Sequence, residues 1–287
     1  MKKIINDPGQ VIDQMVKGIV RENADRLDRL DGTNVVIQRD IEDQVALVSG
    51  GGSGHEPAHA GFVGQGMLQA AICGQVFTSP TSDQVLEAIK AADQGKGVLL
   101  IIKNYSGDVM NFEMAMELAE MEDIQVEKII VDDDIAVEDS DDKQGKRGVA
   151  GTILVHKLLG AAAQNGASLA ELKELGDKAV ANTNSLGVAL TGATVPEVGK
   201  PGFVLDDNEI EFGVGIHGEP GFRKTELKPS AEIAQEIVSR VKQTFSWSSG
   251  EKFGVLVNGL GGTPLMEQYI FLNLSLIHIW RCRRSTL

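Results

Sequence analysis

The chain has 287 residues, of which 42% are hydrophobic and 24% charged, and its formal net charge is -14. This is an ordinary soluble composition, and its acidity excludes the basic surface that nucleic acids or anionic membranes require. Two cysteines form no disulfide framework or zinc cluster, and no apolar run has the length of a signal-peptide core or a membrane span, so we expect a cytoplasmic protein.

The first part of the chain alternates predicted strands with predicted helices. Asp7 and Pro8 open a helix whose apolar residues recur at helical spacing from Val11 to Val20. Strands are expected at 35–38, 45–48, 67–72, 97–103 and 126–131; helices are expected at 82–92, around 112–119, at 148–163 and at 168–182. This alternation predicts parallel crossovers and an α/β domain over residues 1–183, with its ligand site at the carboxyl ends of the strands.

The rest of the chain predicts a second, smaller α/β unit over residues 184–273. Strands are expected at 186–190, 209–214 and 253–257, with a helix at 229–244. Residues 274–287 are basic and aromatic in an acidic chain, and they resemble the translation of a sequencing adapter. We exclude this tail from the functional argument and expect the second domain to be truncated at its C-terminal side.

A glycine-rich segment at residues 49–57 follows the second predicted strand. We expect it to be a loop whose bare amides face a ligand, with His55 as a titratable group at its exit. The alternative is a tight strand-to-helix turn that binds nothing, because glycine also serves turns that need positive φ.

Three short patterns imitate known motifs but lack the required context. Residues 55–59 match H-E-x-x-H, yet Pro57 disfavours the continuous helix that such a zinc site needs. Residues 213–218 match G-x-G-x-x-G, yet residues 219–221 are unsuited to begin a helix. The acidic run at 132–142 is interpreted as a solvated loop, and no P-loop occurs, so we expect neither a metal nor a nucleotide held by this chain.

Four polar residues remain beside glycine-containing loops: His55, Lys103, Asp108 and His217. Each taken singly is more often structural, since a lone histidine is usually packed and a lone aspartate often caps a helix. Together they indicate an acid–base site.

Six segments in one order carry a family resemblance: residues 50–57, 77–80, 103–108, 132–137, 147–152 and 211–221. With them the chain resembles the dihydroxyacetone-binding part of dihydroxyacetone kinases from Met1 to about Asn273. The resemblance implies two α/β domains with the triose site between them, and a homodimer. It also implies a phosphotransferase of glycerol metabolism that converts dihydroxyacetone to its phosphate.

The resemblance also implies a role for each matching residue. His217 would add to the substrate carbonyl and form a hemiaminal, which glycerol cannot do because it lacks a carbonyl. His55 would exchange protons with the bound triose, and Asp108 would bind or deprotonate the attacking hydroxyl. Lys103 and the backbone at Gly52, Ser53 and Gly54 would hold the substrate hydroxyls. The choice between His55 and Asp108 as principal base stays open.

The resemblance places the nucleotide, ADP or ATP with Mg, on a partner rather than on this chain. In the phosphotransferase-dependent form a separate kinase subunit carries it and is served by a phosphocarrier subunit, and this is the form that we favour. The alternatives are an ATP-dependent kinase with a fused nucleotide domain, and a non-catalytic co-activator that senses dihydroxyacetone.

Overall fold

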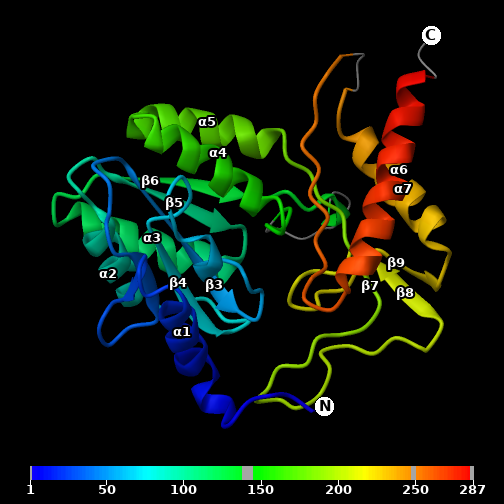
Figure 1. The fold of residues 1–287 in the computed structure, drawn as a ribbon, viewed down its shortest axis with the longest axis horizontal. Helices are drawn as coiled ribbons and strands as arrows, with labels where there is room; N and C mark the ends of the chain where they lie inside the picture. The colour runs from blue at the N-terminus through cyan, green and yellow to red at the C-terminus, as the bar shows by residue number, and fades with distance from the viewer. Residues whose placement is uncertain (1, 138–144, 247–249, 285–287) are drawn as a thin grey trace.

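The structure is a computed structural model that describes residues 2–137, 145–246 and 250–284. A larger unit at the N-terminal side contains a mixed six-stranded sheet, and a smaller unit contains a three-stranded sheet with two helices (Figure 1). No helix in these residues is long and apolar enough to cross a lipid bilayer.

The large sheet has the order β1-β2-β4-β3-β5-β6. Its parallel part consists of four strands: β3 (Ala46–Ser53), β4 (Ala70–Val76), β5 (Val98–Lys103) and β6 (Val126–Val131). The strands β1 (Leu27–Arg29) and β2 (Val35–Gln38) extend it antiparallel beyond β4. The predicted parallel α/β arrangement is therefore confirmed, and β1 is an edge strand that the sequence patterns missed.

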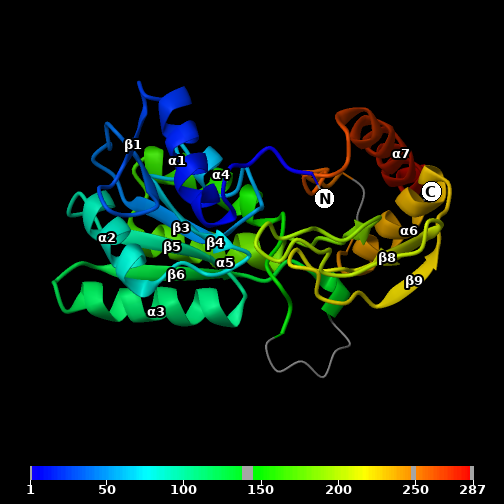
Figure 2. The same ribbon diagram turned by 90° about the horizontal axis from the view of Figure 1, so that it is seen from below.

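Helices cover both faces of this sheet, as Figure 2 shows with α1 above and α3 below it. The helices α1 (Val11–Glu22), α4 (Thr152–Gln164) and α5 (Leu169–Ala181) pack on one face. The helices α2 (Ser82–Ala92) and α3 (Ser106–Glu120) pack on the other. Because both faces are covered, β5 is buried along its whole length, as its apolar run predicts.

The predicted helix starts are confirmed in two places. Asp7 accepts a hydrogen bond from the backbone of Gly9 at the 3-10 helix Pro8–Gln10, which leads into α1. Ser168 and Glu171 form the reciprocal capping box at the start of α5.

The glycine-rich segment is not the open loop that we expected. Gly50, Gly51 and Gly52 belong to β3 and pair with β4. A Cβ on Gly50 would lie 2.7 Å from the carbonyl oxygen of Ile72, and one on Gly52 would lie 2.5 Å from the backbone nitrogen of Thr78. Glycine is needed at these two positions because neighbouring backbone lies where a side chain would stand.

The smaller unit consists of an antiparallel sheet covered by two helices. Its strands are β7 (Val188–Ala189), β8 (Glu209–Phe212) and β9 (Arg223–Glu226), and its helices are α6 (Ser230–Gln243) and α7 (Leu265–Arg284). The strand predicted at 253–257 is wrong, since these residues have no regular structure. Helix α7 runs across the predicted boundary at Asn273, and the foreign origin of the tail stays a prediction.

Candidate functional site

The predicted site residues meet at the boundary between the two units. His55 follows the end of β3, and its ring stacks on Phe77 with centroids 4.9 Å apart and an interplanar angle of 23°. The His217 ring, from the connection between β8 and β9, lies 4.9 Å from the His55 ring. Histidines 162 positions apart in the sequence are thus neighbours in one site.

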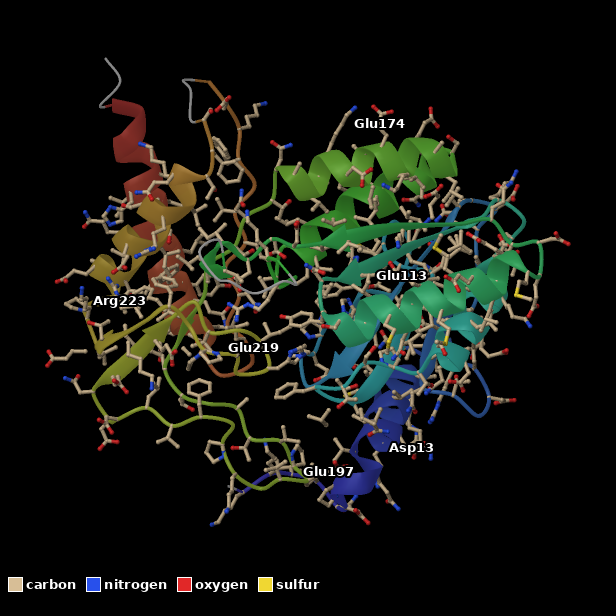
Figure 3. All side chains as sticks on the ribbon, turned by 180° about the vertical axis from the view of Figure 1, so that it is seen from behind. Asp13, Glu113, Glu174, Glu197, Glu219 and Arg223 are labelled. Atoms are coloured by element: carbon tan, nitrogen blue, oxygen red, sulfur yellow. The ribbon has the colours of Figure 1, made fainter. Side chains whose placement is uncertain are left out.

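Glu219 fixes the orientation of His217. The backbone nitrogen of His217 donates to one carboxylate oxygen of Glu219 at 3.0 Å, and Nδ1 lies 3.0 Å from the other. Figure 3 shows Glu219 in the region between the two units. Burial alone would raise the pKa of Glu219, but the hydrogen bonds from His217 outweigh it and lower this pKa to about 2. An ionised carboxylate only accepts hydrogen bonds, so in the neutral ring Nδ1 carries the hydrogen and Nε2 keeps a bare lone pair.

The loop that carries His217 is tied to the larger unit. Arg147 donates to the Asp134 carboxylate at 2.9 Å and to the carbonyl oxygen of Gly213 at 2.7 Å. Gly215 leaves room for the turn, because a Cβ there would lie 2.0 Å from the Glu219 carboxylate. The position of the His217 ring therefore depends on contacts across the boundary between the units.

Lys103 and Asp108 supply the charged groups of the site. Lys103 ends β5, and Asp108 lies in the first turn of α3 rather than in the loop that we expected; both side chains are 4% exposed. Burial raises the pKa of Asp108, whereas a hydrogen bond from Ser79 and the charge of Lys103 act in the opposite direction. One Asp108 carboxylate oxygen is buried without a hydrogen-bond partner in the described residues, and it can accept a proton from a ligand.

The electrostatics keep His55 uncharged. Burial, followed by the positive charge of Lys103, lowers the pKa of His55 to about 3. Its Nε2 is buried and has no hydrogen-bond partner in the described residues. A neutral imidazole in this position can accept a proton from a ligand and return it.

Two aromatic residues and Glu219 complete the site, and we did not assign them from the sequence. The His217 ring lies 5.5 Å from Phe77 and 4.7 Å from Tyr105, centroid to centroid. All three belong to segments that carry the family resemblance, but an aromatic residue considered alone indicates core packing. Phe77 also has a backbone φ of 54°, a conformation that few residues other than glycine adopt. The rings of Phe77 and Tyr105 form a largely apolar wall, and the low dielectric constant beside it strengthens the electrostatic interactions of the nearby charged groups.

The glycine strand contributes less exposed backbone than we expected. The Ser53 hydroxyl donates to the carbonyl oxygen of Gly74 at 2.7 Å, and the Gly54 nitrogen donates to the Glu56 carboxylate at 3.0 Å. The binding role of Gly52, Ser53 and Gly54 stays a prediction. It is restricted to the polar groups of these residues that take no part in the two hydrogen bonds just described.

The imitated motifs lack their structural context, as we expected. Residues 55–59 form no helix, and His59 contacts His156 instead of joining His55. After residues 213–218 the chain enters β9 rather than a helix. The interpretation of the acidic run as a solvated loop is wrong for Asp133 and Asp134, which are 0% and 3% exposed. Asp133 is buried because it accepts hydrogen bonds from the backbone of Val149 and Gly151, and residues 138–142 lie outside the described residues. Among the described side chains no group suited to hold a metal ion occurs.

The site as a whole suits nucleophilic addition to a small carbonyl compound. It combines a bare imidazole nitrogen on His217, a buried carboxylate with an unpaired oxygen, a neutral histidine and an ammonium group. Addition of nitrogen to a carbonyl creates an alkoxide that needs a proton, and the neighbouring groups can supply and remove protons.

Comparisons with known proteins show to which family the chain belongs. The Dak1 domain family matches residues 17–279. The dihydroxyacetone-binding subunit of the PTS-dependent dihydroxyacetone kinase of Lactococcus lactis is 62% identical over 273 residues, which cover 95% of this chain and 82% of the relative.

Two solved structures share the fold. The dihydroxyacetone kinase of C. freundii has a TM-score of 0.88 and 39% identity, and the match covers 95% of this chain and 50% of that one. The dihydroxyacetone kinase operon co-activator has a TM-score of 0.87 and 42% identity, with 92% and 81% of the two chains covered.

Proposed function

The chain belongs to the Dak1 domain family of dihydroxyacetone-binding kinase subunits, and on that premise we propose that it holds dihydroxyacetone covalently for phosphorylation. One observation carries the proposal: Nδ1 of His217 lies 3.0 Å from the Glu219 carboxylate, in a ring that lies 4.9 Å from the His55 ring, and this contact leaves Nε2 of the neutral ring bare. The product is dihydroxyacetone phosphate.

The first step is addition of His217 to the substrate carbonyl. The Nε2 lone pair forms a bond to the carbonyl carbon while the carbon–oxygen π bond breaks, which gives an alkoxide on a cationic imidazole. The Nδ1 hydrogen leaves through Glu219, which returns to its ionised form as this proton is relayed to the alkoxide, and a neutral hemiaminal results. His55, with its unpaired Nε2, is placed to exchange that proton.

The second step uses a terminal hydroxyl of the bound triose. Asp108 accepts the hydroxyl proton as the oxygen attacks the phosphoryl donor, and the raised pKa of a buried carboxyl suits it to that role. Lys103 donates hydrogen bonds to the hydroxyls and balances the developing negative charge. Catalysis by this chain thus consists of holding the triose and managing its protons.

We propose that the phosphoryl group comes from a separate nucleotide-bearing subunit with ADP or ATP and Mg, served by a phosphocarrier subunit. The PTS-dependent relative is 62% identical and is covered over 82% of its length, whereas the C. freundii kinase is 39% identical and is covered over 50%, which supports a separate subunit over a fused kinase. We also propose that the chain acts as a cytoplasmic homodimer.

A sensing function is the second candidate, because the operon co-activator has the same fold and 42% identity. Such a sensor needs the carbonyl-binding histidine but no base for phosphoryl transfer. Asp108 has a buried oxygen without a partner among the described residues, which places it to act as a base, and because a sensor needs no base this favours catalysis over sensing.

The test is an NMR titration of the protein with dihydroxyacetone labelled with ¹³C at the carbonyl carbon. We expect a protein-bound tetrahedral carbon signal in place of the carbonyl signal, its absence in His217→Gln, and no binding of glycerol. A bound carbon that stays trigonal would refute the hemiaminal. Addition of the kinase subunit with its donor then separates catalysis from sensing by formation of dihydroxyacetone phosphate.

A further inference from the structure

A second pair of histidines lies buried behind the glycine strand. His59 precedes the 3-10 helix Ala60–Phe62 and is 5% exposed, and His156 lies in α4 and is fully buried. Nδ1 of His59 lies 3.0 Å from Nε2 of His156, whereas Nε2 of His59 and Nδ1 of His156 have no hydrogen-bond partner in the described residues. Buried polar atoms are normally paired, so the unpaired nitrogens need an explanation.

Ser49 determines which nitrogen of His59 carries the hydrogen. The Ser49 hydroxyl donates its one hydrogen to the carbonyl oxygen of Ile101 at 2.6 Å. The same oxygen lies 3.4 Å from Nδ1 of His59, where it can only accept. Burial, followed by the charge of Lys103, lowers the pKa of His59 well below its usual range, so this ring has one hydrogen. That hydrogen is on Nδ1, shared towards His156, and Nε2 of His59 is bare.

The bare nitrogen and the ammonium group of Lys103 face one small space at Gly51. A Cβ on Gly51 would lie 3.6 Å from Nε2 of His59 and 3.6 Å from Nζ of Lys103, which are ordinary contact distances. Gly51 therefore differs from Gly50 and Gly52, where backbone atoms block a side chain. Because residue 51 has no side chain, the space between the ammonium group of Lys103 and Nε2 of His59 stays open.

We propose that His59 is a positioning residue for Lys103. Its bare Nε2, which has no partner among the described residues, is the acceptor toward which the ammonium group can turn across Gly51, while Ser49 and His156 hold His59 in the tautomer that this bond needs. A buried ammonium group has three N–H donors that each need an acceptor. A hydrogen bond to His59 would satisfy one donor and leave the other two for the hydroxyls of a ligand. The inference rests on the proposed function, in which Lys103 binds the triose.

The tautomer can be tested without any ligand. We would label the histidines with ¹⁵N in the full chain and assign His59 and His156 through the His59→Gln and His156→Gln variants. A two-bond proton–nitrogen correlation spectrum should show the hydrogen on Nδ1 in both rings. A hydrogen on Nε2 of His59 would overturn the proposal whether or not the protein binds dihydroxyacetone.

The effect on binding is tested with matched variants. His59→Gln keeps an acceptor near the position of Nε2, whereas His59→Asn places its amide near Nδ1 and has none facing Lys103. We expect the dissociation constant for dihydroxyacetone to rise about tenfold in His59→Asn, the size of one hydrogen bond to a charged group, and much less in His59→Gln. Equal losses in both variants would refute the positioning role.

Gly51→Ala gives a third measurement if the histidine variants do not fold. Its methyl group meets no clash, so a purely structural role predicts unchanged binding and equal or higher thermal stability. We expect weaker binding at retained stability, because the methyl group separates Lys103 from His59. Unchanged binding in Gly51→Ala would contradict the proposal, and a failure of the wild-type protein to bind would contradict the proposed function instead.

Discussion

The carboxylate of Glu219 is the group that we expect to set the reactivity of His217. Glu219→Ala removes the acceptor at 3.0 Å from Nδ1, so the imidazole is free to place its hydrogen on Nε2, the nitrogen that must attack. A hydrogen bond to a charged group contributes about 1.5–3 kcal/mol, which corresponds to a factor of roughly 10 to 100 in a binding equilibrium. We therefore expect the apparent dissociation constant for dihydroxyacetone to rise by that factor.

Two further variants separate charge from geometry. Glu219→Gln retains a neutral acceptor, whose hydrogen bond contributes about 0.5–1.5 kcal/mol, so we expect a smaller loss than in Glu219→Ala. Gly215→Ala changes no group that takes part in the chemistry, but its Cβ would lie 2.0 Å from the Glu219 carboxylate and would displace it. We expect this variant to bind as weakly as Glu219→Ala.

The assay is the titration with carbonyl-labelled dihydroxyacetone, run together with a thermal melt as a control for folding. The nitrogen spectrum of His217 should show the hydrogen on Nδ1 in the wild type and a mixture of tautomers in Glu219→Ala. If Glu219→Ala forms the tetrahedral species as tightly as the wild type, the reasoning from the tautomer is wrong.

Three other predictions concern the base, the buried histidines and the smaller unit. Asp108→Asn should retain dihydroxyacetone binding and lose about 10² or more in the rate of phosphoryl transfer, measured with the complete kinase, and an equal loss of both would make Asp108 structural. Burial lowers the pKa of His156 from 6.5 to about 3, so the unfolded state binds one proton more between these values and the histidine destabilises the fold as the pH falls through that window. His156→Leu should therefore reduce the pH slope of the unfolding free energy there by about 1.4 kcal/mol per pH unit, as measured by urea unfolding, and an unchanged slope would show that His156 titrates normally. Finally, Leu265, Met266, Tyr269 and Ile270 are 47% to 70% exposed, so the 287-residue chain should aggregate in size-exclusion chromatography and Met266→Lys should reduce this, whereas a monodisperse wild type would contradict the prediction.

Local patterns in the sequence predicted most elements of the larger unit. The apolar run at 97–103, the box Ser168–Glu171 and the helix at 82–92 each contain their own start or burial signal, and the structure confirms them. The patterns failed where tertiary contacts replace local propensity. The glycines of β3 look like a loop in sequence, but they form a strand because backbone from β4 and from the turn after it approaches them.

The sequence by itself determined the kind of chemistry, because His55, Lys103, Asp108 and His217 and the segments around them carry the resemblance to one family. Only the tertiary structure decided how those residues are tuned. It alone brings the Glu219 carboxylate to Nδ1 of His217, buries an Asp108 oxygen that has no partner among the described residues, and brings His59 and Lys103 to the same space at Gly51. The physical reason is that tautomer, burial and charge coupling depend on atoms brought together from distant parts of the chain, and no local pattern records those distances.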